Sequence, residues 1–198
     1  MGKLVVVENM SLDGVAQSPG RADEDPRDGF QRGGWASTWF ATDPEAARAA
    51  MGGRHETTAL LFGSRTYLDL VGHWLSTPGP NPFADILRSM PKHVVTSTLP
   101  DPLPHPNSHA LRGDPAVTVA RLKDEAAGEI VVLGSIRLVH ALTAAGLVDE
   151  YLLTVLPVVL GGGLRLFDTV PVELETVSSS TSPRGAVTAT YRPVRRGS

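Results

Sequence analysis

Two segments of the sequence combine a glycine with a hydroxyl residue where an apolar run ends and a helical pattern begins. They are Gly63-Ser64-Arg65-Thr66 and Gly134-Ser135-Ile136. The first turn of a helix presents backbone N–H groups without acceptors and the positive end of the helix dipole, so such turns bind anions. The alternative is that both segments are ordinary helix starts that bind no ligand. It stays open because neither segment is a full GxGxxG or P-loop pattern.

A carboxylate and a glycine run are two further candidates for chemistry. Asp13 stands in Ser11-Leu12-Asp13-Gly14, directly after the first predicted strand. There it could orient a ligand amine or relay a proton, although Asp-Gly is also a common turn dipeptide. The run Gly161-Gly162-Gly163 allows a backbone to approach a ligand or to take positive φ. A flexible surface turn is the other interpretation of the glycine run.

The composition excludes several classes of site. The chain has no cysteine, its six histidines show no metal-ligand spacing, and no GxSxG setting for a nucleophile occurs. We therefore predict no metal. The net charge is −3, from 18 basic and 21 acidic residues, so nothing points to nucleic acid or an anionic membrane. The apolar run at residues 4–7 is too short for a signal peptide or a membrane span, and we expect a cytoplasmic protein.

The candidate residues must be positioned by strands and helices, and the predicted strands and helices alternate along the chain. We predict strands at 4–7, 58–62, 93–96, 109–112, 129–133 and 150–156, with helices between most of them. Alternating runs at 172–178 and 186–191 predict a C-terminal antiparallel hairpin. The expected fold class is α/β, with a central mixed, mostly parallel sheet and helices on both faces. We expect one domain over residues 1–192, a frayed tail at 193–198, and a long loop at 10–34 that is functional or disordered.

The order of these pieces resembles a known family. The resemblance rests on six segments spread over nearly the whole chain. They are Met10-Ser11-Leu12-Asp13-Gly14-Val15, Leu61-Phe62-Gly63-Ser64-Arg65-Thr66-Tyr67, Val94-Val95-Thr96-Ser97, Val131-Val132-Leu133-Gly134-Ser135, Gly146-Leu147-Val148-Asp149-Glu150, and Pro157 to Gly163 followed by Leu166-Phe167. Together they are similar to the bacterial riboflavin-biosynthesis reductase C-terminal domain family, part of the dihydrofolate-reductase-like superfamily. The resemblance implies the three-layer fold of that superfamily and a homodimer.

The same resemblance implies NADPH bound across the carboxyl edge of the sheet. Carried over by motif, Arg65 and Thr66 would hold cofactor phosphate, and Thr96 to Thr98 would flank the adenine ribose. Asp13, the candidate catalytic residue, would lie near the nicotinamide. The cofactor-binding residues expected in this way are Gly14, Gly63, Ser64, Arg65, Thr66, Thr96, Ser97, Thr98, Gly134, Ser135, Ile136, Arg137, Leu138, Gly161, Gly162 and Gly163. Of these, Gly134 to Ile136 would cradle the pyrophosphate.

The expected function is an NAD(P)H-dependent oxidoreductase that transfers hydride to a C=N or C=O group of a small, heterocyclic substrate. Ser64 stands where relatives often carry a basic residue, and no arginine lies near Ser97, so NADH stays open beside NADPH. The alternative is a non-catalytic nucleotide or small-molecule binding protein on the same fold. Apolar residues continue past Pro157 to Leu160, which favours a covering dimer partner, or else burial under the chain's own hairpin.

Overall fold

The computed structural model describes residues 1–51, 56–168 and 170–194. The chain forms two compact units. The first unit consists of Met1–Val5 and His55–Leu147, and the second unit consists of Val6–Arg54 and Val148–Ser198. Whether the whole chain behaves as one domain stays a prediction.

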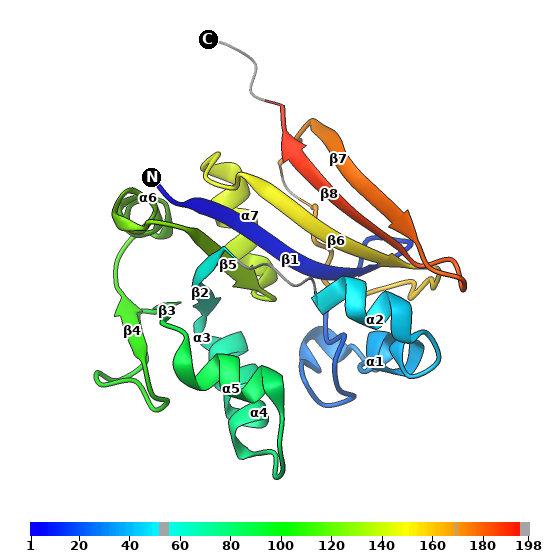
Figure 1. Cartoon of the computed structure of the whole chain (residues 1–198), viewed down its shortest axis with the longest axis horizontal. Coiled ribbons are helices and arrows are strands. Elements are labelled where there is room, and N and C mark those ends of the chain that lie inside the picture. Colours follow the sequence, from blue (N-terminus) through cyan, green and yellow to red (C-terminus); the bar gives the residue numbers. More distant parts are fainter. Residues whose placement is uncertain (52–55, 169, 195–198) are drawn as a thin grey trace. The chain divides into compact units, whose positions relative to one another are not determined.

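The strands form a mixed sheet of eight, in the order β4-β3-β2-β5-β1-β6-β8-β7 (Figure 1). Their bounds are β1 Lys3–Ser11, β2 Thr57–Gly63, β3 Lys92–Val95, β4 Ser108–Leu111, β5 Glu129–Leu133, β6 Glu150–Leu156, β7 Leu174–Thr181 and β8 Val187–Pro193. Strand β1 contributes residues to both units. The predicted fold class, α/β with a mostly parallel sheet and an antiparallel C-terminal hairpin, is confirmed.

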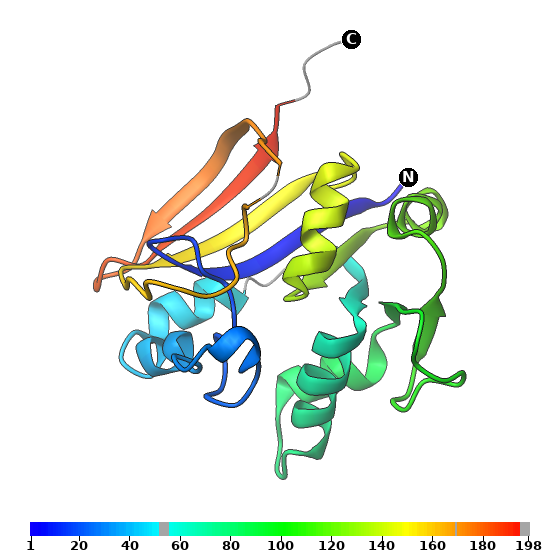
Figure 2. The same ribbon diagram turned by 180° about the vertical axis from the view of Figure 1, so that it is seen from behind.

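The first unit is built on parallel strands. Strand β2 pairs in parallel with β3 on one side and β5 on the other, and β3 pairs in parallel with β4. Helix α7 packs against β2 and helix α6 (Figure 2). The helical segments of this unit are α3 Ser64–Thr66, η2 Tyr67–Val71, α4 Gly72–Ser76, α5 Pro82–Ser89, α6 Pro115–Glu125 and α7 Ile136–Ala144. Parallel pairing brings the carboxyl ends of these strands to one edge of the sheet.

Two helices of the first unit begin with residue types that are typical of helix N-termini. Asn81 caps α5 because its side-chain oxygen accepts the N–H groups of Phe83 and Ala84, and Asp114 caps α6 in the same way. In both helices a proline stands in the first turn, where its missing N–H costs nothing. Local sequence therefore determines where these two helices begin.

The second unit is antiparallel in its C-terminal part, where β8 pairs with β6 and with β7. Its helical segments are η1 Arg27–Gly29, α1 Trp35–Phe40 and α2 Pro44–Met51. The carboxylate of Asp43 accepts the N–H of Ala46 at the start of α2, and it also accepts the hydroxyl of Ser182 at 2.6 Å. One side chain thus fixes both the start of α2 and the turn between β7 and β8.

The residues on which the dimer expectation rested are largely covered within the second unit. Leu160 is 6% exposed and belongs to a hydrophobic cluster with Val15, Phe30 and Leu156, and Val158 packs against the same cluster. Val159 is exposed. The apolar run past Pro157 therefore needs no partner chain to cover Leu160, and the homodimer stays a prediction that rests on the family resemblance.

The structure also changes some predicted boundaries. Strand β1 continues to Ser11, four residues beyond the predicted end at Val7. The predicted frayed tail is wrong for its first two residues, because Pro193 ends β8 and the N–H of Val194 donates to the carbonyl of Glu173. Residues 195–198 lie outside the described residues. No helix in the described part of the chain is long and apolar enough to cross a membrane.

Candidate functional site

Three of the turns singled out in the sequence lie at one edge of the first unit. Gly63 ends β2, Thr96 follows β3 and Gly134 follows β5. Because β2 lies between the other two strands and pairs in parallel with both, these turns are neighbours. Ligands of α/β sheets collect at the carboxyl ends of parallel strands. The first unit therefore has a candidate ligand-binding edge made of three turns.

The turns after β2 and β5 are joined directly. The N–H of Gly63 donates to the hydroxyl of Ser135 at 2.9 Å. Gly134 and Ser135 both have left-handed φ, +59° and +64°, which places the Ser135 side chain against the neighbouring turn. A Cβ on Gly134 would lie 2.9 Å from the side-chain methyl carbon of Thr66, so only glycine fits without a shift. The two turns form one packed structure.

Helix α7 starts at this junction without a side-chain cap. The hydroxyl of Ser135 is used by Gly63 and not by the helix. Ile136 and Arg137 stand in the first helical turn, where the N–H groups have no acceptor inside the helix. Leu138 differs in its backbone, because its N–H donates to the Ser135 carbonyl, whereas the side chains of both Ile136 and Leu138 are buried. We therefore assign Leu138 to packing, while Ile136 and Arg137 remain candidates for contact with an anion.

The remaining side chains predicted at this edge vary in exposure. The hydroxyl of Thr96 is buried and accepts the N–H groups of Thr98 and Leu99, so it shapes its own turn. Ser97, Thr98 and Arg65 are exposed. Arg65 is thus a cation available at the edge, whereas Thr96 acts within the turn.

In the second unit, Asp13 holds a distant loop in place. Its carboxylate accepts the N–H groups of Leu160 at 3.0 Å and Gly161 at 2.8 Å, and the hydroxyl of Ser11 at 2.7 Å. The hydrogen bond from Leu160 is the largest cause that lowers the pKa of Asp13 from 3.8 to about 2, and the bonds from Ser11 and Gly161 add to it. Asp13 is therefore ionised near neutral pH. These contacts favour a positioning role over proton transfer.

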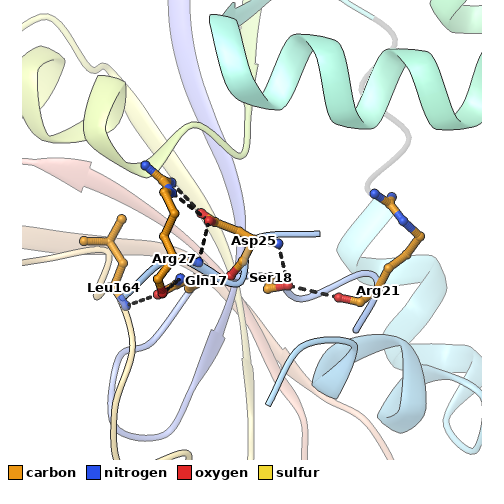
Figure 3. Close-up of polar contacts among 6 residues, drawn as sticks. All are labelled: Gln17, Ser18, Arg21, Asp25, Arg27 and Leu164. Carbon is orange, nitrogen blue, oxygen red and sulfur yellow. Dashed lines mark hydrogen bonds and ion pairs between the residues drawn. The ribbon is translucent and has the colours of Figure 1, made fainter. Parts of the chain in front are cut away.

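The loop that precedes α1 is ordered by one buried amide. Gln17 is 3% exposed, and its side-chain N–H₂ donates to the carbonyls of Asp25 and Arg27 while its oxygen accepts the N–H of Leu164 (Figure 3). Ser18 adds a second link, because its hydroxyl donates to the carbonyl of Arg21 and accepts the N–H of Asp25. The long loop at residues 10–34 is therefore folded onto the glycine-rich segment that follows β6.

These two segments of the second unit line an open cavity of about 480 Å³. That volume is in the range of small-molecule sites. Its charged lining residues are Arg27, which pairs with Asp25, together with Asp28 and Arg32. The full lining is Gln17, Arg27, Asp28, Gly29, Phe30, Gln31, Arg32, Leu160, Gly162, Gly163 and Leu164.

The glycines of the Gly161–Gly163 run differ in what surrounds them. A Cβ on Gly163 would meet carbons of Phe30 and Val15 at 2.8 Å, and its φ is +117°. Gly161 and Gly162 have open space where a side chain would stand. Gly163 is therefore required for packing, and Gly161 and Gly162 leave the backbone accessible. Gly14, also predicted at the cofactor, has φ +82° in the turn that carries Asp13.

Sequence reasoning missed one titratable residue of the second unit. Glu8 lies inside β1, is 5% exposed, and its Oε1 is buried with no hydrogen-bond partner among the described residues. Burial is the main cause that raises its pKa from 4.5 to about 8, and the charge of Glu24 adds to the shift. A carboxylate directly after the apolar run Leu4–Val7 was the available signal, but the predicted strand ended before it.

Metal ligands are not gathered in the described part of the chain, where no group of three or more histidine, cysteine or acidic residues has a metal-binding arrangement. Trp35 belongs to the core cluster of the second unit, and its ring N–H donates to the carbonyl of Gln17.

Comparison with solved structures defines the class of fold. A protein assigned to riboflavin biosynthesis from Shewanella sp. PV-4 matches with a TM-score of 0.63 and 20% identity, over 98% of this chain and 100% of that chain. A pyrimidine reductase-like protein from Corynebacterium diphtheriae matches with a TM-score of 0.60 and 13% identity, over 98% of this chain and 93% of that chain. Dihydrofolate reductase from Enterococcus faecalis, complexed with NADP(H), matches with a TM-score of 0.58 and 17% identity, over 98% of this chain and 98% of that chain. The fold is that of dihydrofolate reductase.

The family follows from a sequence match. The model of the RibD C-terminal domain matches residues 3–188, almost the whole chain. The chain belongs to the RibD C-terminal domain family, which confirms the resemblance stated from the motifs. No curated protein matches it.

Proposed function

We propose that this chain is an NAD(P)H-dependent reductase that transfers hydride to a C=N or C=O group of a small, heterocyclic substrate. The observation that carries the proposal is the edge of the first unit, where the turns after β2, β3 and β5 are neighbours and two of them are hydrogen-bonded to each other. Membership of the RibD C-terminal domain family and the fold shared with an NADP(H)-bound dihydrofolate reductase support it.

The first unit would hold the dinucleotide. The backbone N–H groups of Ile136 and Arg137, with the left-handed turn at Gly134 and Ser135, suit a pyrophosphate, because they are available and the helix dipole favours negative charge. The exposed guanidinium of Arg65 suits a phosphate of the same cofactor. The bound dinucleotide supplies the hydride, and the residues of the chain position and orient it.

The second unit would hold the small substrate in its cavity of about 480 Å³. Asp13 serves that cavity indirectly, because it fixes Leu160 and Gly161 next to the lining residues Gly162 and Gly163. We therefore assign Asp13 a positioning role. Gly161 and Gly162, whose surroundings are open, would let a ligand approach the backbone.

Titration of NADPH and NADH, followed by the fluorescence of the reduced nicotinamide, tests the proposal. We expect saturable binding of at least one dinucleotide well below the millimolar range. Arg65→Gln should weaken NADPH binding about tenfold, which is a loss of about 1.4 kcal/mol. Arg121→Gln is the matched control, since Arg121 is an exposed arginine on α6, away from the strand ends, and should leave affinity unchanged. No saturable binding of either dinucleotide would refute the proposal.

A pair of glycine variants separates strain from binding. Gly134→Ala and Gly146→Ala both put a side chain on left-handed backbone, at the two ends of α7, but only the Gly134 variant meets Thr66. Both should lose stability, and only Gly134→Ala should lose cofactor affinity, by tenfold or more. Equal affinities in the two variants would place the pyrophosphate elsewhere.

Turnover distinguishes an enzyme from a binding protein. Oxidation of the cofactor with any of a panel of dihydropterins, flavin precursors and cyclic imines supports the reductase. Tight binding of the dinucleotide without oxidation across the panel would favour the non-catalytic binding protein. A homodimer and a location in the cytoplasm belong to the same proposal, on the family resemblance.

A further inference from the structure

The segment from Leu160 to Leu164, which follows β6, is held at both of its ends. The backbone N–H groups of Leu160 and Gly161 donate to the carboxylate of Asp13, at 3.0 and 2.8 Å. The N–H of Leu164 donates to the side-chain oxygen of Gln17 at 2.8 Å. Side chains from a segment far away in the sequence therefore fix the backbone on either side of Gly162 and Gly163.

The two N–H groups between these anchors are not used by the fold. Neither the N–H of Gly162 nor that of Gly163 has an acceptor among the described residues. Both glycines are exposed, and both line the cavity of about 480 Å³ in the second unit. Backbone N–H groups are strong donors, and ligand sites use a small number of such groups to fix the orientation of a ligand. The cavity therefore offers two adjacent donors to a ligand.

The anchors also tie these donors to the opposite wall of the cavity. Gln17 is 3% exposed and lines the cavity, and its side-chain N–H₂ donates to the carbonyls of Asp25 and Arg27 (Figure 3). One buried amide thus connects the segment that carries the two glycines with the loop that faces it. Donors that are already held in place lose little conformational freedom when a ligand binds.

The charges of the lining side chains do not favour an anion. The guanidinium of Arg27 is paired with Asp25, while Asp28 and Arg32 bring one charge of each sign. The apolar part of the lining consists of Phe30, Leu160 and Leu164. Apolar walls with a few fixed polar groups are typical of sites for small ring compounds.

Asp13 gives a second reason to expect a neutral ligand. Its carboxylate is ionised near neutral pH and accepts the N–H of Gly161, the residue directly before Gly162. A negative charge on a ligand atom at Gly162 would be repelled by that carboxylate. A neutral carbonyl oxygen accepts two hydrogen bonds without this cost, since it has two lone pairs.

We propose that the cavity binds a neutral ring compound through a carbonyl oxygen, and that the N–H groups of Gly162 and Gly163 donate to this oxygen. The apolar walls contact the ring, and Asp13 and Gln17 are positioning residues that hold the two donors. The inference rests on the proposed function, because it takes this cavity as the substrate site. It narrows the substrate class to neutral rings that carry a carbonyl group.

Three small probes test the inference on the full chain, in nitrogen–proton correlation spectra of the labelled protein. Oxindole is a neutral cyclic amide, indoline is the same ring system without the carbonyl oxygen, and benzoate is an anion. Oxindole should move the amide-proton resonances of Gly162 and Gly163 downfield in a saturable way, because a proton donated to oxygen is deshielded. Indoline should not move them downfield, and benzoate should bind more weakly than oxindole.

Two variants of Gly162 separate the donor from the shape of the loop. Gly162→Pro removes one N–H, whereas Gly162→Ala keeps it and puts its side chain into open space. The proline variant should bind oxindole about fivefold more weakly, the usual effect of one lost hydrogen bond, and the alanine variant should bind within about twofold of wild type. Hydrogen exchange at Leu160 and Gly161 should match in the two variants. If the proline alters the loop, the wild-type titration decides.

Each outcome supports or overturns a stated part of the inference. An oxindole titration that leaves the resonances of Gly162 and Gly163 in place would overturn the assignment of the donors, and so would equal oxindole affinities of the two variants. Benzoate binding tighter than oxindole would overturn the neutral class of ligand. Oxindole binding at these glycines without binding of any dinucleotide would overturn the reductase proposal alone. Dinucleotide binding without oxindole binding would overturn only the present inference.

Discussion

Replacing the ionisable Glu8 by the neutral Gln should raise the free energy of unfolding. This gain should increase as the pH rises. Folding keeps Glu8 protonated up to a pKa of about 8, whereas the unfolded chain releases the proton near 4.5. Between these values the folded state binds more protons than the unfolded state, so stability falls with pH. One pKa unit corresponds to about 1.4 kcal/mol, so Glu8 costs about 3 kcal/mol at pH 7 and about 4–5 kcal/mol above pH 8. Glu8→Gln should remove that cost.

The assay is urea unfolding at pH values from 5 to 9, followed by tryptophan fluorescence, since Trp35 and Trp39 lie in the second unit. The quantity to compare is the free energy of unfolding of Glu8→Gln minus that of the wild type. Other titrating groups cancel in this difference. It should be small near pH 5 and should rise by about 1.4 kcal/mol per pH unit up to pH 7.5. A difference that stays constant across the range would refute the reasoning, because it would mean that Glu8 ionises alike in both states.

Three further predictions concern the joined turns, the Asp13 loop and the assembly. Ser135→Ala removes the acceptor of the Gly63 N–H and should cost about 1 kcal/mol in thermal unfolding, whereas Ser135→Gly also relieves a positive φ and should cost less. Asp13→Asn should speed hydrogen exchange at Leu160 and Gly161. Because its folded pKa is depressed, wild-type Asp13 stabilises the fold above pH 3.8, and this contribution should be lost as the pH falls towards 2. Light scattering at micromolar concentration should give about twice 21.0 kDa, and a value near 21.0 kDa would contradict the homodimer.

The strand-end turns of the first unit could be predicted from the sequence because their signal is local. An apolar run, a glycine and a hydroxyl residue before a helical pattern occur together at the ends of β2 and β5. Parallel pairing then brings the two turns to the same edge, and the helical segments between these strands supply the crossover that parallel strands need. What remained open was how the turns contact each other. The bond between Ser135 and Gly63 joins residues 72 positions apart, and no local pattern encodes it.

The long loop at residues 10–34 shows the opposite case. Its glycines, prolines and charges carry no period, so the sequence left it as functional or disordered. Its order comes from Gln17, whose amide binds two carbonyls of the loop and one N–H of the segment after β6. For the apolar residues Val158 and Leu160 the sequence left two kinds of cover open, a dimer partner or the chain's own hairpin. Their cover, Val15 and Phe30, lies on a segment far away in the sequence.

The carboxyl group of Glu8 on β1 and that of Asp13 in the turn after it have opposite environments, and this difference sets their protonation states. Asp13 meets three hydrogen-bond donors, each of which favours the ionised form, while Glu8 is buried, meets the negative charge of Glu24, and has an oxygen without a partner. Their pKa values are pushed apart, to about 2 and about 8, so at neutral pH Asp13 is ionised and Glu8 holds its proton. The Asp-Gly turn drew attention to Asp13 because turn chemistry is visible in the sequence. Burial is what raises the pKa of Glu8, and burial depends on what packs around a strand, which the sequence does not show locally.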